Sequence, residues 1–258
     1  MKPAALLLLA LPLLLPTPAA AAKIAKEKLT FKGQERRYAL YVPDAVAAQA
    51  PTAAAKVPLV LVFHEGRSDG DALVSRWRKQ ADQGGFVVAG VDALNKAQWN
   101  LVSEPPALFR QMIDAIAAKA PVDPRRVYLF GNWDGGLHAI AVALIESEYF
   151  TAVATHASAF QPGQYGILDA AKRKLPVSIQ MGNQDQNVGL RMELVRGTEE
   201  QMRQRGLPIE VAVLRGHDNF YAGLSGKINQ QAWEFLSRHT LPGEPVFRDP
   251  DLHIQVEH

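Results

Sequence analysis

One stretch of the chain, residues 126–145, constrains the fold more than any other. Residues 127–130 (VYLF) are apolar, aromatic and β-branched, as in a short buried strand, and the Ala-rich residues 137–145 are expected to form a helix. The turn between them, residues 131–136, reads GNWDGG. A strand, a sharp turn bounded by glycines and a helix together form the setting of the G-x-S-x-G catalytic turn. In that frame Trp133 stands at the nucleophile position, and an indole cannot attack a carbonyl.

The beginning of the chain has the three parts of a secretory signal. A basic Met1-Lys2 is followed by an apolar stretch over residues 4–15 and by small residues at 18–22. The apolar stretch is too short for a membrane span, which needs roughly 20 residues, and prolines interrupt it. We therefore predict that residues 1–22 are a signal peptide cut after Ala22. The protein is then exported, to the periplasm or the extracellular space.

Composition excludes several classes of function. The sequence contains no cysteine, so disulfides, thiolate catalysis and thiolate metal ligands are absent. Its 28 basic residues nearly balance its 26 acidic residues, which gives no electrostatic reason to expect nucleic acid or an anionic membrane as a partner. The histidines lack the spacings of metal-binding motifs. We expect no metal, no cofactor, no nucleic acid and, after signal cleavage, no membrane partner.

The remaining chain alternates between strand and helix patterns. Residues 27–31 and 36–42 alternate polar and apolar positions around a turn, which predicts an opening antiparallel hairpin, and the continuous apolar run 57–63 predicts a central parallel strand. Further strands are expected at 86–91, 127–130, 152–155, 177–181 and 209–214, and helices at 71–83, 106–119, 137–145, 190–205 and 228–238. This order predicts one α/β domain over residues 23–240, with a mainly parallel sheet covered by helices on both faces. Residues 241–258, rich in proline and charge, are expected to be a C-terminal tail.

Polar residues follow several of the predicted strands, at the edge where open α/β sheets place their sites. His64 and Glu65 follow the strand 57–63, and Trp133 and Asp134 follow the strand 127–130. Asp185 and His217 lie in the loops after the strands 177–181 and 209–214. The chain order of nucleophile position, acid and histidine is the order found in α/β-hydrolases.

Several stretches carry a family resemblance: residues 58–64 (PLVLVFH), residues 122–131, the pair Gly135-Gly136, and the loops 182–185 and 216–217. Over about residues 28–236 the chain resembles secreted α/β-hydrolase esterases of the polyhydroxybutyrate depolymerase and feruloyl esterase group. The resemblance implies an α/β-hydrolase fold in which Asp185 is a relic acid and His217 a relic base. That family carries Ser where this chain has Trp133, and Gly where this chain has Glu65.

Two interpretations of this pattern stay open. In the first, the protein is a pseudoenzyme that binds a small-molecule or polymeric ester or glycan, with Trp133 as a stacking surface. The oxyanion hole formed by the His64 loop and Asp134 is then spoiled by Glu65, which adds negative charge and lacks the backbone freedom of glycine. In the second, the turn is shifted by one residue, and Asp134 acts as a carboxylate nucleophile with His217, as in haloalkane dehalogenases. The ungapped match favours Trp133 at the apex.

Some of these residues also have a purely structural interpretation. Asp134 is a suitable N-cap for the helix that follows it, and His64 at the end of a strand is a suitable hydrogen-bonding support for its loop. Trp77 and Trp233 fall in helical patterns and are expected in the core. Trp99, in a polar loop, is expected to line a pocket.

Overall fold

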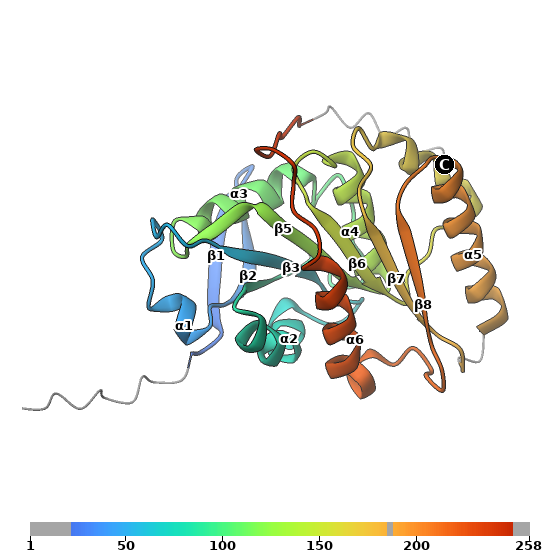
Figure 1. The fold of residues 1–258 in the computed structure, drawn as a ribbon, viewed down its shortest axis with the longest axis horizontal. Helices are drawn as coiled ribbons and strands as arrows, with labels where there is room; N and C mark the ends of the chain where they lie inside the picture. Colours follow the sequence, from blue (N-terminus) through green and yellow to red (C-terminus); the bar gives the residue numbers. More distant parts are fainter. Residues whose placement is uncertain (1–21, 185–187, 250–258) are drawn as a thin grey trace, which may run out of the picture.

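The structure is a computed structural model that describes residues 22–184 and 188–249. It contains one eight-stranded sheet in the order β1-β2-β4-β3-β5-β6-β7-β8 (Figure 1). The strands are β1 (Ala25–Phe31), β2 (Gln34–Tyr41), β3 (Val57–Phe63), β4 (Val87–Val91), β5 (Val122–Asn132), β6 (Ala152–His156), β7 (Val177–Gly182) and β8 (Ile209–Leu214). β2 is antiparallel to β1 and β4, and all other neighbouring strands are parallel. The predicted sheet and its opening hairpin are confirmed.

Helices cover both faces of the sheet. They are α1 (Asp44–Ala47), α2 (Gly70–Gly84), α3 (Pro106–Ala117), α4 (Asp134–Ile145), the 3-10 helix η1 (Pro162–Ala170), α5 (Val188–Gln204) and α6 (Tyr221–Leu236). Apolar residues of α2 and α6 pack against one face, and those of α3, α4 and α5 pack against the other (Figure 1). None of the helices in the described ranges is long and apolar enough to cross a membrane.

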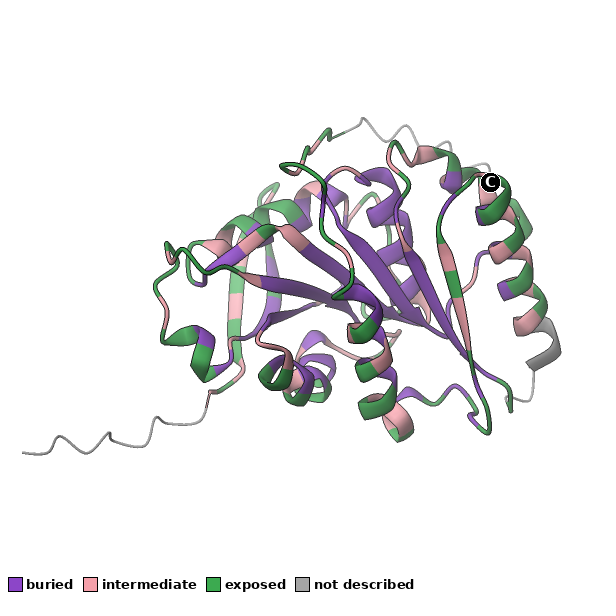
Figure 2. Cartoon of the chain, in the orientation of Figure 1, coloured by how far each residue is buried: buried purple, intermediate pink, exposed green. Residues whose placement is uncertain are grey.

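The strand β3 shows why the central strands read as continuous apolar runs. Leu61 and Phe63 belong to the core on one face, and Val60 and Val62 belong to the core on the other. Successive side chains point to opposite faces, so a strand covered on both sides needs apolar residues at every position. All four side chains are fully buried, and Figure 2 shows the central strands as a continuous buried layer.

The expected core tryptophans lie where the helical patterns place them. Trp77 is fully buried, and its ring makes an edge contact with Phe130 of β5. Trp233 is half-buried and stacks on Phe86, with a distance of 3.9 Å between the ring centroids. Both side chains therefore fasten their helices, α2 and α6, to the same face of the sheet.

Several elements differ from the expected boundaries. β5 runs over Val122–Asn132 rather than 127–130, and α4 begins at Asp134 rather than at residue 137. α6 begins at Tyr221 rather than Ile228, because a short helical segment joins it through a kink at Leu224. The glycines within this segment weaken its helical pattern, so its start is hard to see in the sequence. At the other end, residues of the predicted tail pack on the domain: the backbone N–H of Leu241 donates to Arg125, and Phe247 contacts Tyr149 edge-on.

The ends of β3 and β5 and the start of α4 meet very closely. A Cβ atom at Gly131 would lie 2.4 Å from the carbonyl oxygen of Gly135. A Cβ atom at Gly135 would lie 2.3 Å from the carbonyl oxygen of His64. Since real Cβ atoms do not approach other atoms so closely, only glycine fits at these two positions. The turn after β5 is thereby held directly against the loop after β3.

We expect Gly135→Ala to lower the free energy of unfolding by about 1–3 kcal/mol, because the added methyl group must push α4 away from His64. Gly226→Ala in α6 is the matched control. A Cβ there meets nothing within 4 Å, and alanine favours a helix by roughly 0.5–1 kcal/mol over glycine. Urea unfolding curves measure both changes. If Gly135→Ala were as stable as the wild type, the close contact would not be a constraint.

Candidate functional site

The turn after β5 contains one residue, Trp133, with a strained backbone conformation. Trp133 has φ 53° and ψ −122°, and it is the residue that precedes the first turn of α4. A positive φ is unfavourable for a bulky residue and costs on the order of 1–3 kcal/mol, so the surrounding contacts must impose it. The backbone N–H of Trp133 donates to the carbonyl oxygen of His156, and the Ser158 hydroxyl donates to the carbonyl oxygen of Trp133. The strained residue of the turn is therefore Trp133, and Asp134 begins the helix.

The side chain of Asp134 turns back toward the loop after β3. Its Oδ1 accepts a hydrogen bond of 2.8 Å from the backbone N–H of Gly66, while its Oδ2 is buried without a partner among the described residues. The expectation that Asp134 is an N-cap is wrong. The cap position belongs to Trp133, and the carboxylate binds a different loop instead of the N–H groups of its own helix.

His64 holds its loop through both ring nitrogens. Its Nδ1 lies 2.7 Å from the carbonyl oxygen of Glu65, and its Nε2 accepts a hydrogen bond of 3.1 Å from the backbone N–H of Ala93. Because Nε2 accepts, the proton of the neutral ring is on Nδ1, where it is donated to Glu65. The carbonyl oxygen of His64 also accepts a hydrogen bond from the Trp99 indole. These contacts agree with the structural interpretation of His64.

Glu65 brings a carboxylate to the edge where an oxyanion hole would form. Its Oε2 accepts a hydrogen bond of 3.0 Å from Asn132. Burial raises the pKa of Glu65, and the charge of Asp134 raises it further. Glu65 is not among the described residues with positive φ, so the expected conflict with its backbone angles is not seen. Its charge remains unfavourable for a developing oxyanion.

His217 lies at the same edge of the sheet, after β8. Its ring is buried, and its Nε2 lies 3.1 Å from Nε2 of His156 at the end of β6. Its Nδ1 lies 3.6 Å from a carboxylate oxygen of the exposed Asp218. Burial lowers the pKa of His217, and Asp218 partly opposes this effect. The expected partner Asp185 lies outside the described residues.

His156 is the site residue that the sequence interpretation missed. It is fully buried, and its Nδ1 lies 2.8 Å from Oδ1 of Asn132. The sequence held a signal for it, because His156 is the last residue of β6, at the same sheet edge as the other candidates.

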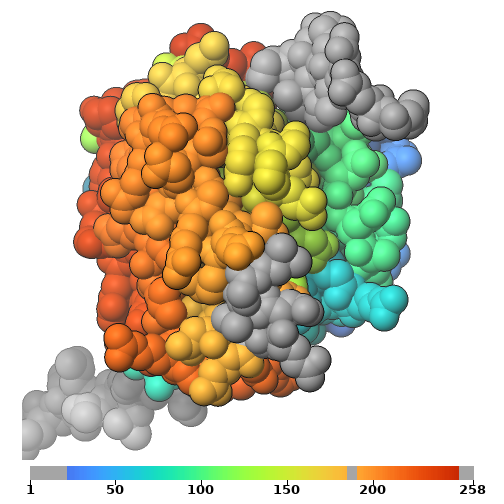
Figure 3. Space-filling view, turned by 90° about the vertical axis from the view of Figure 1, so that its right-hand side faces the viewer, coloured from blue at the N-terminus to red at the C-terminus, as the bar shows by residue number. Residues whose placement is uncertain are grey.

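A cleft of about 470 Å³ opens beside the turn. Trp99 and Leu101 of the loop after β4 form one wall, and Phe160 and Ile167 of the η1 region form another. Asp134 and the start of α4 close its end. Figure 3 shows the yellow η1 segment beside the green loop that carries Trp99. As expected, Trp99 lines a pocket, in which apolar walls surround a few polar groups.

Buried contacts fix the loop that carries Trp99. The indole ring stacks on His138 with 5.0 Å between the ring centroids. Near the end of the same loop, Glu104 forms a buried ion pair of 2.9 Å with Arg36 and accepts backbone hydrogen bonds from Leu94 and Asn100. Removing one partner of such a buried pair typically costs about 3–5 kcal/mol, a large part of the roughly 5–15 kcal/mol by which a folded protein is stable. The wall of the cleft is therefore preformed.

Trp133 contacts a cation from the other side of the site. The guanidinium carbon of Arg191 in α5 lies 4.0 Å from the centroid of the half-buried Trp133 ring. A cation over the face of an indole is an attractive arrangement. The contact links the turn after β5 to α5.

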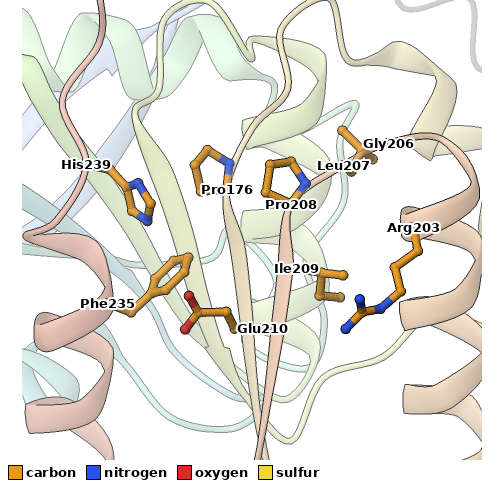
Figure 4. Close-up of a pocket in the computed structure, with 9 residues that line it drawn as sticks. All are labelled: Pro176, Arg203, Gly206, Leu207, Pro208, Ile209, Glu210, Phe235 and His239. Carbon is orange, nitrogen blue, oxygen red and sulfur yellow. The ribbon is translucent and has the colours of Figure 1, made fainter.

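Two further observations define the limits of the site. The described ranges contain no group of three or more His, Cys, Asp or Glu residues that could hold a metal ion. A second hollow, with Phe235 and His239 on one side, lies at the opposite edge of the sheet (Figure 4). It surrounds Pro176 and Pro208, which precede β7 and β8, so it is remote from the turn.

Comparison with known proteins gives the same fold. A family model described as "Putative esterase" matches residues 41–237, and no curated protein matches the chain. The S-formylglutathione hydrolase of Staphylococcus aureus is similar with a TM-score of 0.69 at 14% identity, over 84% of this chain and 100% of that chain. A ferulic acid esterase of Anaeromyces mucronatus is similar with a TM-score of 0.65 at 11% identity, over 86% and 93%. A thermostable esterase is similar with a TM-score of 0.65 at 19% identity, over 84% of this chain but 63% of that longer chain. The predicted α/β-hydrolase fold is confirmed.

Proposed function

The chain belongs to this esterase family, and from that premise we propose that it is an exported, ligand-binding homologue without serine-type turnover. The observation that carries the proposal is the backbone of Trp133, whose φ of 53° and ψ of −122° place an indole at the strained position of the turn. An indole has no atom that can form an acyl intermediate. The Trp133 ring contacts the Arg191 guanidinium and is not among the residues that line the cleft.

The electrostatics of the site support the same proposal. Esterases stabilise a developing oxyanion with backbone N–H groups, here those of Glu65 and Asp134. The side chains of both residues carry carboxyl groups. Burial and the charge of Asp134 raise the pKa of Glu65, which means that added negative charge is already unfavourable at this edge. A negative charge at this edge opposes the charge that forms in ester hydrolysis. The missing nucleophile and the added acidic group therefore both support a protein without serine-type turnover.

Hydrolysis with Asp134 as nucleophile is the alternative, and the geometry gives it less support. Asp134 Oδ1 accepts a hydrogen bond from Gly66, so this oxygen is directed at the loop. Nε2 of His217, the atom that would activate water, is 3.1 Å from His156. A nucleophile and its base need mutual reach. Among the described residues no hydrogen bond joins Asp134 to His217: Oδ1 of Asp134 accepts from Gly66 and Nε2 of His217 lies against His156, while Oδ2 of Asp134 has no partner.

The cleft supports a ligand with an apolar or aromatic body and a polar end. Trp99, Phe160 and Ile167 supply apolar walls, and Asn100 and Gln164 supply amide groups beside them. We propose a small-molecule or polymeric ester or glycan as the ligand, with no nucleic acid and no membrane as a partner. Methyl ferulate is a suitable probe, because one protein of similar fold is a ferulic acid esterase.

We expect the wild-type protein to show no turnover of p-nitrophenyl acetate or butyrate above the His217→Ala variant. Losing a triad serine typically lowers turnover by about six orders of magnitude. Trp133→Ser alone is expected to restore at most weak activity, because the carboxyl group of Glu65 remains in the loop expected to form the oxyanion hole. Trp133→Ser combined with Glu65→Gly is expected to be the more active variant. Release of p-nitrophenol, followed by absorbance, measures all four proteins.

Three outcomes of this assay would contradict the proposal. Strong wild-type hydrolysis that is lost in Asp134→Asn but kept in Trp133→Ala would identify Asp134 as the nucleophile. Strong hydrolysis that is lost only in His217→Ala would indicate attack by a water molecule. Restored activity of Trp133→Ser that matches a restored activity of the double variant would show that Glu65 is no obstacle, whereas variants that are all inert leave the binding proposal standing.

We also propose that the mature protein begins at Lys23, after signal cleavage. Expression of the full chain in a bacterium with a general secretion pathway should give a periplasmic or secreted product whose N-terminal sequence starts KIAKEK. Changing Leu8 and Leu9 to Arg breaks the apolar stretch and should leave the uncut chain inside the cell. Recovery of the wild-type chain in the membrane fraction with Met1 or Lys2 at its start would instead mean a retained anchor.

A further inference from the structure

Four polar side chains form a continuous chain along the carboxyl edge of the sheet. Oε2 of Glu65 accepts a hydrogen bond of 3.0 Å from Nδ2 of Asn132. Oδ1 of Asn132 lies 2.8 Å from Nδ1 of His156, and Nε2 of His156 lies 3.1 Å from Nε2 of His217. The residues come from the loop after β3, the ends of β5 and β6, and the loop after β8. Neither the mechanism of esterases nor the cleft explains why these four side chains are hydrogen-bonded in a row.

The carboxylate at one end fixes the direction of every hydrogen bond. An ionised carboxylate only accepts, so the amide NH₂ of Asn132 must face Glu65 and the amide oxygen must face His156. Nδ1 of His156 must then carry a proton, because its neighbour is an acceptor. A neutral His156 with its proton on Nδ1 has a lone pair on Nε2. The hydrogen bond to His217 therefore requires a proton on Nε2 of His217.

The surroundings of both rings favour the neutral forms that this pattern needs. Burial, together with the neighbouring His217, lowers the pKa of His156 to about 3. Burial also lowers the pKa of His217. Two neutral imidazoles can share one hydrogen bond at 3.1 Å, whereas two cations would repel each other there. Each of the three hydrogen bonds that join these four side chains therefore contains one proton.

We propose that His156 is a positioning residue that holds His217 in the tautomer with its proton on Nε2. In a catalytic triad the histidine has the opposite tautomer, with the proton on Nδ1 and the lone pair on Nε2 directed at the nucleophile. In this protein the lone pair of His217 is on Nδ1. The exposed carboxylate of Asp218 lies 3.6 Å from Nδ1, too far for the hydrogen bond that would draw a proton to this nitrogen. His217 therefore offers no base at the atom that would activate serine or water. This inference deepens the proposed function, since it adds a second reason for the lack of turnover.

NMR signals of the histidine ring nitrogens show which nitrogen carries the proton, so they measure the tautomer without any measurement of turnover. We suggest labelling the full chain with ¹⁵N-histidine and recording correlations between ring nitrogens and ring protons at neutral pH. Protonated and unprotonated ring nitrogens give well-separated signals, and single substitutions assign them. His64 is an internal control, because its contacts with Glu65 and Ala93 require the proton on Nδ1. We expect the Nδ1–H tautomer for His156 and the Nε2–H tautomer for His217.

Two variants test what holds the tautomer. His156→Phe keeps a ring but removes the acceptor, so His217 is expected to shift toward the Nδ1–H form or a mixture of both. Glu65→Gln keeps the shape of the side chain, but its amide can donate as well as accept. The direction of the hydrogen bonds is then no longer fixed, and His156 should become a mixture of its two tautomers. His64 is expected to keep its signals in both variants.

The inference is overturned if His217 in the wild type has its proton on Nδ1, or if it is a cation with both nitrogens protonated. It is also overturned if His217 stays purely Nε2–H in a folded His156→Phe variant, because another group would then hold the tautomer. Failure of the proposed function is a separate result: an active wild-type esterase would be seen in the p-nitrophenyl assay, whatever tautomer the spectra show.

Discussion

The close contact between the start of α4 and the ends of β3 and β5 is the constraint on which the site depends. Gly131 and Gly135 allow backbone to approach backbone at distances that no side chain would permit. The contact forces the strained backbone of Trp133 and brings Asp134 against the loop after β3. A scaffold that holds one residue at a sharp apex is useful for presenting a nucleophile. In this chain the same scaffold presents an indole.

The polar side chains around that turn form one hydrogen-bond network. Glu65, Asn132, His156 and His217 connect four strand ends through hydrogen bonds of 2.8–3.1 Å. A fully satisfied buried network is stabilising and specific, while a partly satisfied one is costly. Each of the four side chains has a partner in this network, so the buried position of His217 has a structural explanation. The proposals of impaired ester chemistry and of a fixed His217 tautomer both rest on this network.

The sequence predicted the fold well where local pattern and burial agree. Residues 57–63 form β3 as predicted, because a strand covered on both faces must be apolar at every position. The start of α6 was missed, since glycines and a kink at Leu224 hide it. Trp133 at the strained turn followed from a local motif. His156 was missed because its role depends on contacts between strands that are far apart in the chain.

The central claim is that the cleft binds a ligand which the protein does not convert. The most direct measurement is a calorimetric titration of the wild-type protein with methyl ferulate, with chromatography of the same sample for free ferulate. The account predicts saturable binding without product, weakened by at least about tenfold in Ile167→Glu, which places a charge in an apolar wall. Accumulation of ferulate, or the absence of binding by the wild type, would contradict it.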